Sequence, residues 1–242
     1  MLNDFDWIGK ELLTLGLIGS HSGNMSVRAD DKILITKRNS MLAHLKEDDI
    51  IEVPLNESSP NDELASRELI VHRAIYKATN AGSILHAHPP YAIAVSITDN
   101  RIQPADAEGC HFISAVPVVW ARELIGSEDI ARLAPQFISN TSPVIVVKGH
   151  GSFAIGENLE KAYQWTSCLE NSCKVLVFTR LLGHKGYGQQ PQQGPTHQPK
   201  DRRDSRARGT DGRDSRDSRG RPRHVGIISV RGSDFDRKDR RR

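Results

Sequence analysis

The sequence predicts an α/β layered domain over residues 1–187, followed by a low-complexity tail over residues 188–242 that we expect to be mostly disordered. Two observations carry this prediction. As far as residue 182, segments of helical periodicity alternate with short apolar segments of strand type. Beyond that point the chain consists mainly of Arg, Asp, Ser, Gly, Gln and Pro, which cannot bury enough apolar surface to offset the entropy of ordering.

Each element of the domain has its own signal. Apolar residues at helical spacing that stop at Gly16 predict an N-terminal helix, and similar spacing after Asn158 predicts a long C-terminal one. Between them, apolar and β-branched runs bounded by turn residues predict strands, and Pro89-Pro90 fixes the start of a helix. The expected strands are 25–28, 32–36, 49–53, 83–86, 116–119, 143–148 and 153–155, and the expected helices are 8–15, 64–80, 91–97 and 158–182.

Charge is distributed unevenly along the chain. Residues 1–182 carry a net charge of −6 and residues 183–242 a net charge of +9, which add up to the formal +3. An acidic domain is not a nucleic-acid-binding one, and the acids interspersed among the arginines of the tail favour a solvating role over contact with RNA. No apolar run is long enough to span a membrane, the N-terminus has no secretory leader, and the three cysteines form no disulfide framework. We therefore expect a cytoplasmic protein.

Two histidines end one predicted strand. His86 and His88 flank Ala87, and residues i and i+2 of a strand point to the same side, so both imidazoles can reach one ion. His150 leaves another predicted strand between two glycines, which let the backbone turn closely around it. Three neutral imidazoles with a fourth position open make a site for catalytic zinc or a similar divalent ion. The alternative is three unrelated loop histidines.

Glu68 follows Ser66 and Arg67 in the first turn of the predicted second helix, where a carboxylate is also favoured simply as a partner of the helix dipole. Asn24 and the Thr36–Asn39 segment are turn sequences by default. They also hold the amide, the backbone N–H groups and the cations from which anion sites are built. The residues alone leave both interpretations open.

Together, these motifs resemble the class II aldolase/adducin family. The resemblance covers about residues 3–182, and the combination is far more specific than any single motif. The segments that match in order and spacing are Ser22–Arg28, the loop after Thr36, Ser66–Glu68, His86–Pro89 and Gly149–Gly151. The stretches Pro104–Gly109 and Val116–Val119 look most like the archaeal fuculose-phosphate-aldolase branch of the family.

The resemblance implies a three-layer α/β/α sandwich around a predominantly antiparallel sheet. It implies that His86, His88 and His150 hold Zn²⁺, or another divalent metal such as Mn²⁺, Co²⁺ or Fe²⁺. The acidic residue of the family falls on Glu68, which in the aldolases ligates the resting metal, leaves it when substrate binds, and then transfers the proton. Family members commonly form cyclic homotetramers.

The family holds the substrate phosphate with a Gly-Asn segment, a Thr-Gly pair and two serines. The residues that match are Gly23, Asn24 and Ser66. Arg67 stands in place of the second serine, and Arg38-Asn39 stands in place of the Thr-Gly pair. Because a guanidinium binds phosphate well through its planar fork, we interpret the two arginines as replacements, with solvated surface charges as the alternative.

The implied reaction is the reversible cleavage of a ketose 1-phosphate, L-fuculose 1-phosphate or similar, to dihydroxyacetone phosphate and an aldehyde such as L-lactaldehyde, through a metal-stabilised enediolate. Tyr187 is a candidate for the tyrosine that family aldolases recruit from their C-terminal segment, or else a linker residue. Same-fold alternatives are a dehydratase of the methylthioribulose-1-phosphate type, with Glu108 as its acid/base instead of an ordinary loop carboxylate, and L-ribulose-5-phosphate 4-epimerase. An adducin-like scaffold is disfavoured, because adducin heads have lost the metal ligands that this chain retains.

Overall fold

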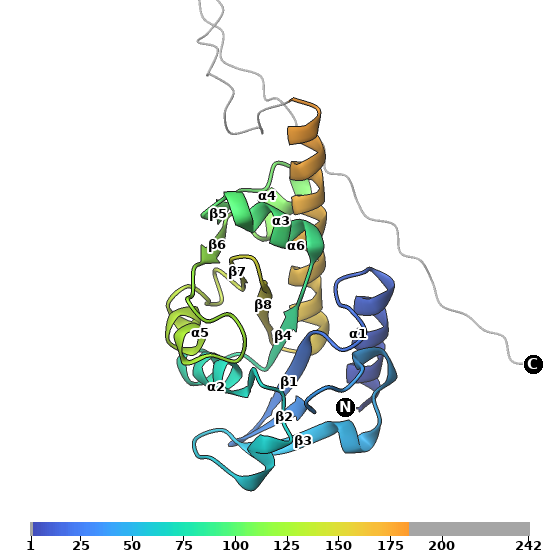
Figure 1. The fold of residues 1–242 in the computed structure, drawn as a ribbon, viewed down its shortest axis with the longest axis vertical. Helices are drawn as coiled ribbons and strands as arrows, with labels where there is room; N and C mark the ends of the chain where they lie inside the picture. Colours follow the sequence, from blue (N-terminus) through green and yellow to red (C-terminus); the bar gives the residue numbers. More distant parts are fainter. Residues whose placement is uncertain (1, 184–242) are drawn as a thin grey trace, which may run out of the picture. The chain divides into compact units, whose positions relative to one another are not determined.

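The computed structural model describes residues 2–183, which hold six α-helices, four 3-10 helices and eight strands (Figure 1). The helices are α1 (Leu2–Thr14), α2 (Leu69–Ala78), α3 (Pro90–Thr98), α4 (Ala107–Phe112), α5 (Glu128–Leu133) and α6 (Leu159–Leu181), with η1 (Leu42–His44), η2 (Glu47–Asp49), η3 (Pro60–Glu63) and η4 (Ala134–Gln136). The predicted tail, residues 188–242, and Tyr187 lie outside the described residues.

All eight strands form one sheet in the order β3-β2-β1-β4-β8-β7-β6-β5. Among the described strands only β6 and β7 pair in parallel, so the expectation of a predominantly antiparallel sheet is confirmed. The strands are β1 (Asn24–Ala29), β2 (Lys32–Thr36), β3 (Ile50–Pro54), β4 (Ser83–Ala87), β5 (Arg101–Ile102), β6 (Val116–Val119), β7 (Val144–Val147) and β8 (Gly151–Gly156). The central strand β4 places His86 opposite Asn24 of β1 on one side and opposite Phe153 of β8 on the other.

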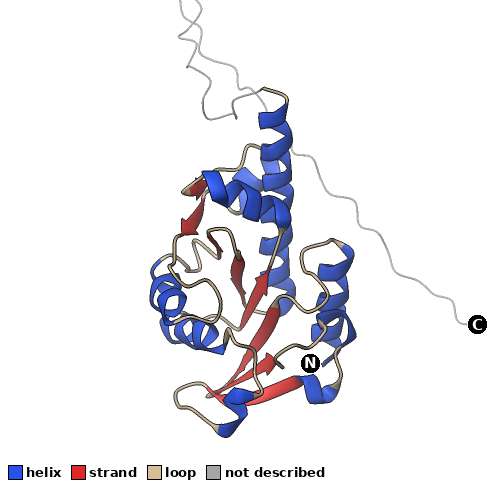
Figure 2. Ribbon diagram, in the orientation of Figure 1, coloured by secondary structure: helices blue, strands red, loops and turns tan. Residues whose placement is uncertain are grey.

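Helices cover both faces of this sheet, which confirms the three-layer α/β/α arrangement (Figure 2). Helices α1, α3, α4 and α6 lie on one face, and α2 and α5 lie on the other (Figure 1). The two cores alternate along β4, because successive residues of a strand point to opposite faces. Leu85 and Ala87 join the core under α6, whereas Ile84 joins the core under α2 and α5. His86 therefore emerges on the α2 and α5 face.

The structure differs from the expected elements in several places; for example, α1 begins at Leu2 rather than at residue 8, and β5 was not expected. Helix α2 begins at Leu69 rather than Leu64, because η3 and a stretch of irregular backbone occupy residues 60–68. Sequence analysis missed α4 and α5, each only six residues long, although Asp106 and Ser127 cap them with side-chain oxygens that accept from the N–H groups of Gly109 and Ile130. Such short helices show less than two turns of apolar periodicity.

None of the helices within residues 2–183 is both long enough and apolar enough to cross a lipid bilayer. The longest, α6, instead packs along β8, β4, β1 and β7, and its buried side chains include Cys168 and Cys173. The expectation that these two cysteines are core residues is confirmed.

Candidate metal centre

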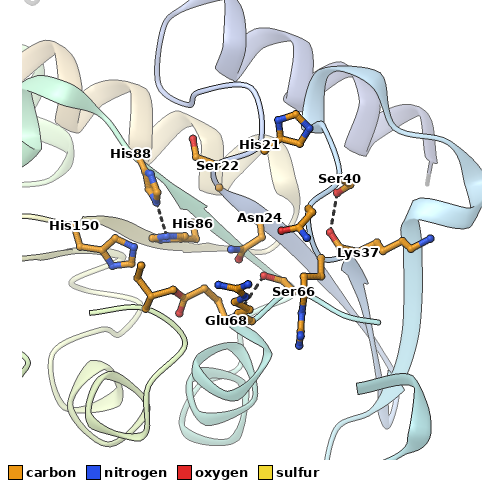
Figure 3. A pocket seen from close by; sticks show the side chains of 15 residues that line it. His21, Ser22, Asn24, Lys37, Ser40, Ser66, Glu68, His86, His88 and His150 are labelled. Atoms are coloured by element: carbon orange, nitrogen blue, oxygen red, sulfur yellow. Dashed lines mark hydrogen bonds between the residues drawn. The ribbon is translucent and has the colours of Figure 1, made fainter. Parts of the chain in front are cut away.

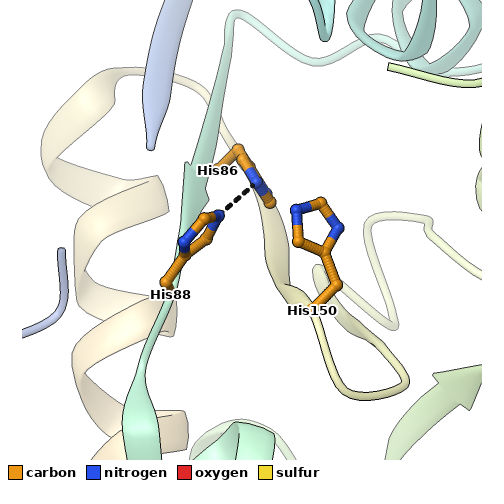
Figure 4. Close-up of side chains that lie close together, drawn as sticks. All are labelled: His86, His88 and His150. Atoms are coloured by element: carbon orange, nitrogen blue, oxygen red, sulfur yellow. Dashed lines mark hydrogen bonds between the residues drawn. The ribbon is translucent and has the colours of Figure 1, made fainter. Parts of the chain in front are cut away.

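The three predicted histidines meet at one end of the central strands (Figure 4). His86 lies on β4, His88 follows the end of that strand, and His150 lies in the turn between β7 and β8. The Nε2 atoms of His86 and His88 are 3.0 Å apart, and one ligand atom from each of the three rings lies within 4.8 Å of the other two. The structure therefore brings these residues together, as a single divalent site requires.

The surrounding backbone fixes the orientation of His86. Its Nδ1 lies 2.9 Å from the carbonyl oxygen of Ser152, and since a carbonyl only accepts, Nδ1 carries the proton and Nε2 keeps its lone pair. The ring also stacks on Phe153, with centroids 4.3 Å apart. Gly151 lets the backbone of β8 pass close to the end of β4, because a Cβ atom at Gly151 would lie 2.4 Å from the carbonyl oxygen of Ala87 and 2.8 Å from the ring of His88. The orienting bond to a backbone carbonyl is typical of histidines that bind metals.

Burial keeps the three imidazoles neutral. Desolvation lowers the pKa of His86 well below its usual value, lowers the pKa of His88, and lowers the pKa of His150 to about 4, with the neighbouring histidines adding to the effect for His86 and His150. His150 Nδ1 is buried and has no hydrogen-bond partner among the described residues. Neutral, converging imidazoles with an unsatisfied nitrogen suit a divalent cation. Three imidazole nitrogens are a donor set that binds Zn²⁺ and other divalent transition metals such as Co²⁺ and Fe²⁺.

Glu68 lies immediately before α2, and its side chain does not cap that helix. It is 3 % exposed; its Oε1 accepts a hydrogen bond of 3.0 Å from the N–H of Gly126, and its Oε2 is buried without a partner among the described residues. Desolvation raises the pKa of this carboxyl to about 7. A buried carboxyl that titrates near neutrality is suited to accept and return a proton.

A cavity of about 210 Å³ joins Glu68 to the histidines (Figure 3). All of the predicted substrate-binding residues line it: Gly23, Asn24, Arg38, Asn39, Ser66 and Arg67. Gly23 has a φ of 80°, and a Cβ atom there would lie 2.9 Å from the carbonyl oxygen of His86, so a larger residue would crowd the metal centre. Asn24 Oδ1 is buried and unpaired among the described residues, which leaves it available to a ligand.

Sequence reasoning missed several residues of the cavity wall. His21, Ser40 and Ile125 line it as well. His21 and Ser40 flank recognisable motifs, so their proximity in sequence is the available signal. Ile125 approaches from the loop before α5, far along the chain, and no local pattern marks it.

The alternative acid/base candidate, Glu108, lies outside this cavity. Glu108 is in the first turn of α4 rather than in a loop, and it lines a different hollow together with Trp7 and Cys168. Within one chain it therefore does not share the cavity of the histidines.

Comparison with known proteins gives one family. The family described as "Class II Aldolase and Adducin N-terminal domain" matches residues 5–177. The solved structure of l-fuculose-1-phosphate aldolase from Thermus thermophilus is 35% identical, with a TM-score of 0.71, over 78% of this chain and 96% of that one. An L-fuculose phosphate aldolase from Methanocaldococcus jannaschii is 32% identical over 69% of this chain and 89% of its own length.

A third relative carries a different name. A probable bifunctional methylthioribose-1-phosphate isomerase/methylthioribulose-1-phosphate dehydratase from Nocardia farcinica is 28% identical over 70% of this chain. The chain spans only 34% of the length of that relative, so the match concerns one part of a larger protein.

Proposed function

Because the chain belongs to the class II aldolase and adducin family, we propose that it is a metal-dependent aldolase that reversibly cleaves a ketose 1-phosphate, L-fuculose 1-phosphate or similar, to dihydroxyacetone phosphate and an aldehyde such as L-lactaldehyde. The observation that carries the proposal is the position of Glu68: a buried carboxyl with one free oxygen lines the same cavity as three neutral histidines.

His86, His88 and His150 would hold the metal, and Zn²⁺ is the ion that we expect ahead of Mn²⁺, Co²⁺ and Fe²⁺. When bound, such an ion supplies Lewis-acid stabilisation of the negative charge that develops on the dihydroxyacetone phosphate half as the C3–C4 bond breaks. The hydrogen bond from His86 to the Ser152 carbonyl keeps the ligating nitrogen aimed into the cavity.

Glu68 would also ligate the metal before substrate binds, and would then move the proton. Its free Oε2 can accept the proton of the C4 hydroxyl, and the Gly126 N–H holds Oε1 while it does so. With a pKa near 7, the carboxyl can release that proton again at neutral pH. No lysine Schiff base is needed in this scheme.

The substrate phosphate would lie against Gly23, Asn24, Asn39 and Ser66, with Arg38 and Arg67 supplying the positive charge. Support comes from the cavity lining, which brings all six residues into the same cavity as the histidines. The guanidinium groups replace hydroxyl donors with charged forks, which bind phosphate more strongly.

A same-fold dehydratase is the second candidate, and the relative from Nocardia farcinica favours it. In that case Glu108 would be the acid/base. Its place in another hollow of the same chain weighs against this role, unless a second subunit presents it. We also propose that the protein is cytoplasmic and forms a homotetramer; light scattering of the purified protein would test the oligomeric state.

The test is the release of dihydroxyacetone phosphate from L-fuculose 1-phosphate, with chelator and with Zn²⁺ added back. Release that chelator abolishes and zinc restores supports the aldolase. Glu68→Gln should lower the rate by about a hundredfold to ten-thousandfold, whereas Glu63→Gln, an exposed neighbour, should leave it unchanged. If the protein binds metal but releases nothing, the dehydratase is favoured, and Glu108→Gln is the next variant to assay on methylthioribulose 1-phosphate.

A further inference from the structure

A second hollow adjoins the cavity of the histidines. Its volume is about 660 Å³, against about 210 Å³ for the cavity that holds the metal centre. Arg38, Ser66 and Arg67 line both hollows. A phosphate held by these three residues therefore lies at the junction between the two.

Positive charge is concentrated in this second hollow. Five cationic side chains line it, against two carboxylates. The cations are Arg38, Arg67, Arg73, Lys77 and Arg132, and the carboxylates are Asp62 and Glu128. The net charge of residues 1–182 is −6, so the hollow is a positively charged region within an acidic domain.

Several of these cations have no internal partner. Two of the five cations are already paired: Arg73 pairs with Asp62 and also donates to the carbonyl oxygen of Pro54, and the exposed Arg132 pairs with Asp129. Arg38, Arg67 and Lys77 form no ion pair with any residue that the structure describes. Unneutralised like charges around one concavity favour an anionic ligand.

The hollow is also long and partly apolar. It follows the outer side of α2 from Ile70 to Lys77, a rise of about 10 Å for seven residues of helix. Ala74 of α2 and Ala131 of α5, a helix packed against α2, also line it. Such a wall fits an organic group attached to an anion, and the volume is that of a small-molecule site.

We propose that this hollow is an anion-binding subsite for a second negatively charged group linked through the substrate's phosphate, so that the enzyme prefers a ketose 1-phosphate whose phosphate carries a further anion, as in a diphosphate ester or phosphodiester, over the simple monoester. Arg38 and Arg67 hold the proximal phosphate, and Lys77 and Arg132 face the distal anion. The proposal rests on the proposed function, because it takes the substrate phosphate to lie at the residues shared by the two hollows.

Binding of simple anions tests the proposal without requiring the natural substrate. Calorimetric titrations of the full chain would compare inorganic phosphate with tripolyphosphate, both with metal bound and after chelator treatment, since tripolyphosphate also binds metals. The variants are Lys77→Ala and Arg132→Ala, with Lys10→Ala as an exposed control on α1. All of them keep the basic segment 183–242, so a difference between variants cannot arise from polyanion binding there.

We expect Lys77→Ala and Arg132→Ala each to weaken tripolyphosphate binding by about threefold to tenfold and to leave phosphate binding unchanged. Lys77→Glu should weaken it further. Equal affinities in Lys77→Ala, Arg132→Ala and Lys10→Ala would overturn the proposal. Cleavage of a ketose monophosphate together with that result would leave the proposed function intact, whereas loss of tripolyphosphate affinity without any cleavage would support the subsite and count against the proposed reaction.

Discussion

The two faces of the central sheet differ in what they bury. The face under α1, α3, α4 and α6 is packed with aliphatic side chains, such as Leu85, Val146 and Leu169, and the polar side chains that α6 buries there, Thr166, Glu170 and Ser172, lie outside the cavity of the histidines. The face under α2 and α5 buries polar side chains beside its apolar ones: Ser26 contacts His72 and Tyr76 there, and His86 and Glu68 lie near its edge. We therefore expect the first face to contribute mainly to stability and the second to carry the candidate site, with the neighbouring β4 residues Leu85 and His86 pointing to opposite faces.

The largest effect should come from the aliphatic face. Leu85→Ala removes a fully buried side chain next to His86 and should lower the free energy of unfolding by about 2–5 kcal/mol. Because Leu85 points away from the cavity, zinc affinity should change less than about tenfold at temperatures where the variant is folded. Urea unfolding of the metal-free protein and a chelator competition measure the two quantities. A loss of metal affinity as large as the loss of stability would contradict the division between faces.

His150→Ala should have the opposite effect to Leu85→Ala: a large loss of zinc affinity and little loss of stability. Removing one ligand should weaken zinc binding by about 3 kcal/mol, a factor of more than a hundred. The stability of the metal-free protein should hardly change, since the Nδ1 of His150 has no hydrogen bond to lose. The exposed His111 is the matched control, and His111→Ala should alter neither quantity. Unchanged zinc affinity in His150→Ala would remove this histidine from the site.

Glu68→Gln should stabilise the metal-free protein at alkaline pH. Burial raises the pKa of Glu68 from an ordinary 4.5 to about 7, so folding favours the protonated form. Stability from this group is fully present below pH 4.5 and is lost as the pH rises through 7, by up to about 3 kcal/mol. The variant should therefore have a flatter profile of unfolding free energy between pH 4.5 and pH 8. If the stability of the variant depended on pH as strongly as that of the parent, burial would not be destabilising the ionised form of Glu68.

The smallest effect concerns the segment that follows the candidate ligands His86 and His88. Glu170 of α6 accepts hydrogen bonds from the N–H groups of Tyr91 (3.0 Å) and Ala92 (2.9 Å), at the start of α3, where Pro89 offers no side-chain cap. Glu170→Ala should lower the free energy of unfolding by about 1–2 kcal/mol. Glu160→Ala, exposed on the same helix, should change it by less than about 0.5 kcal/mol. Equal melting temperatures for the two variants would show that α3 does not depend on this carboxylate.

Sequence reasoning recovered the parts of the molecule that have local signals. Strand β2 was predicted with its observed bounds, and α6 was predicted to within one residue at each end, because its periodicity is long and Asn158 caps it. The convergence of His86 and His88 follows from strand geometry. The short helices α4 and α5 carry too few residues to show a period, and the approach of Ile125 and Gly126 to the site depends on packing between distant segments. The raised pKa of Glu68 likewise depends on its burial, which a single sequence does not reveal.

The position of β4 also governs when the site can exist during synthesis. Its partner β1 precedes it in the chain, whereas its other partner, β8, and the turn that carries His150 come much later. Pairings between segments so distant in the sequence form slowly, because bringing the two ends of the long intervening chain together costs entropy. A nascent chain that ends before β7 holds His86 and His88 without their companion and cannot complete the three-nitrogen set. The three nitrogens can therefore converge only once β4 and β8 have paired, so we expect metal affinity to depend on assembly of the sheet.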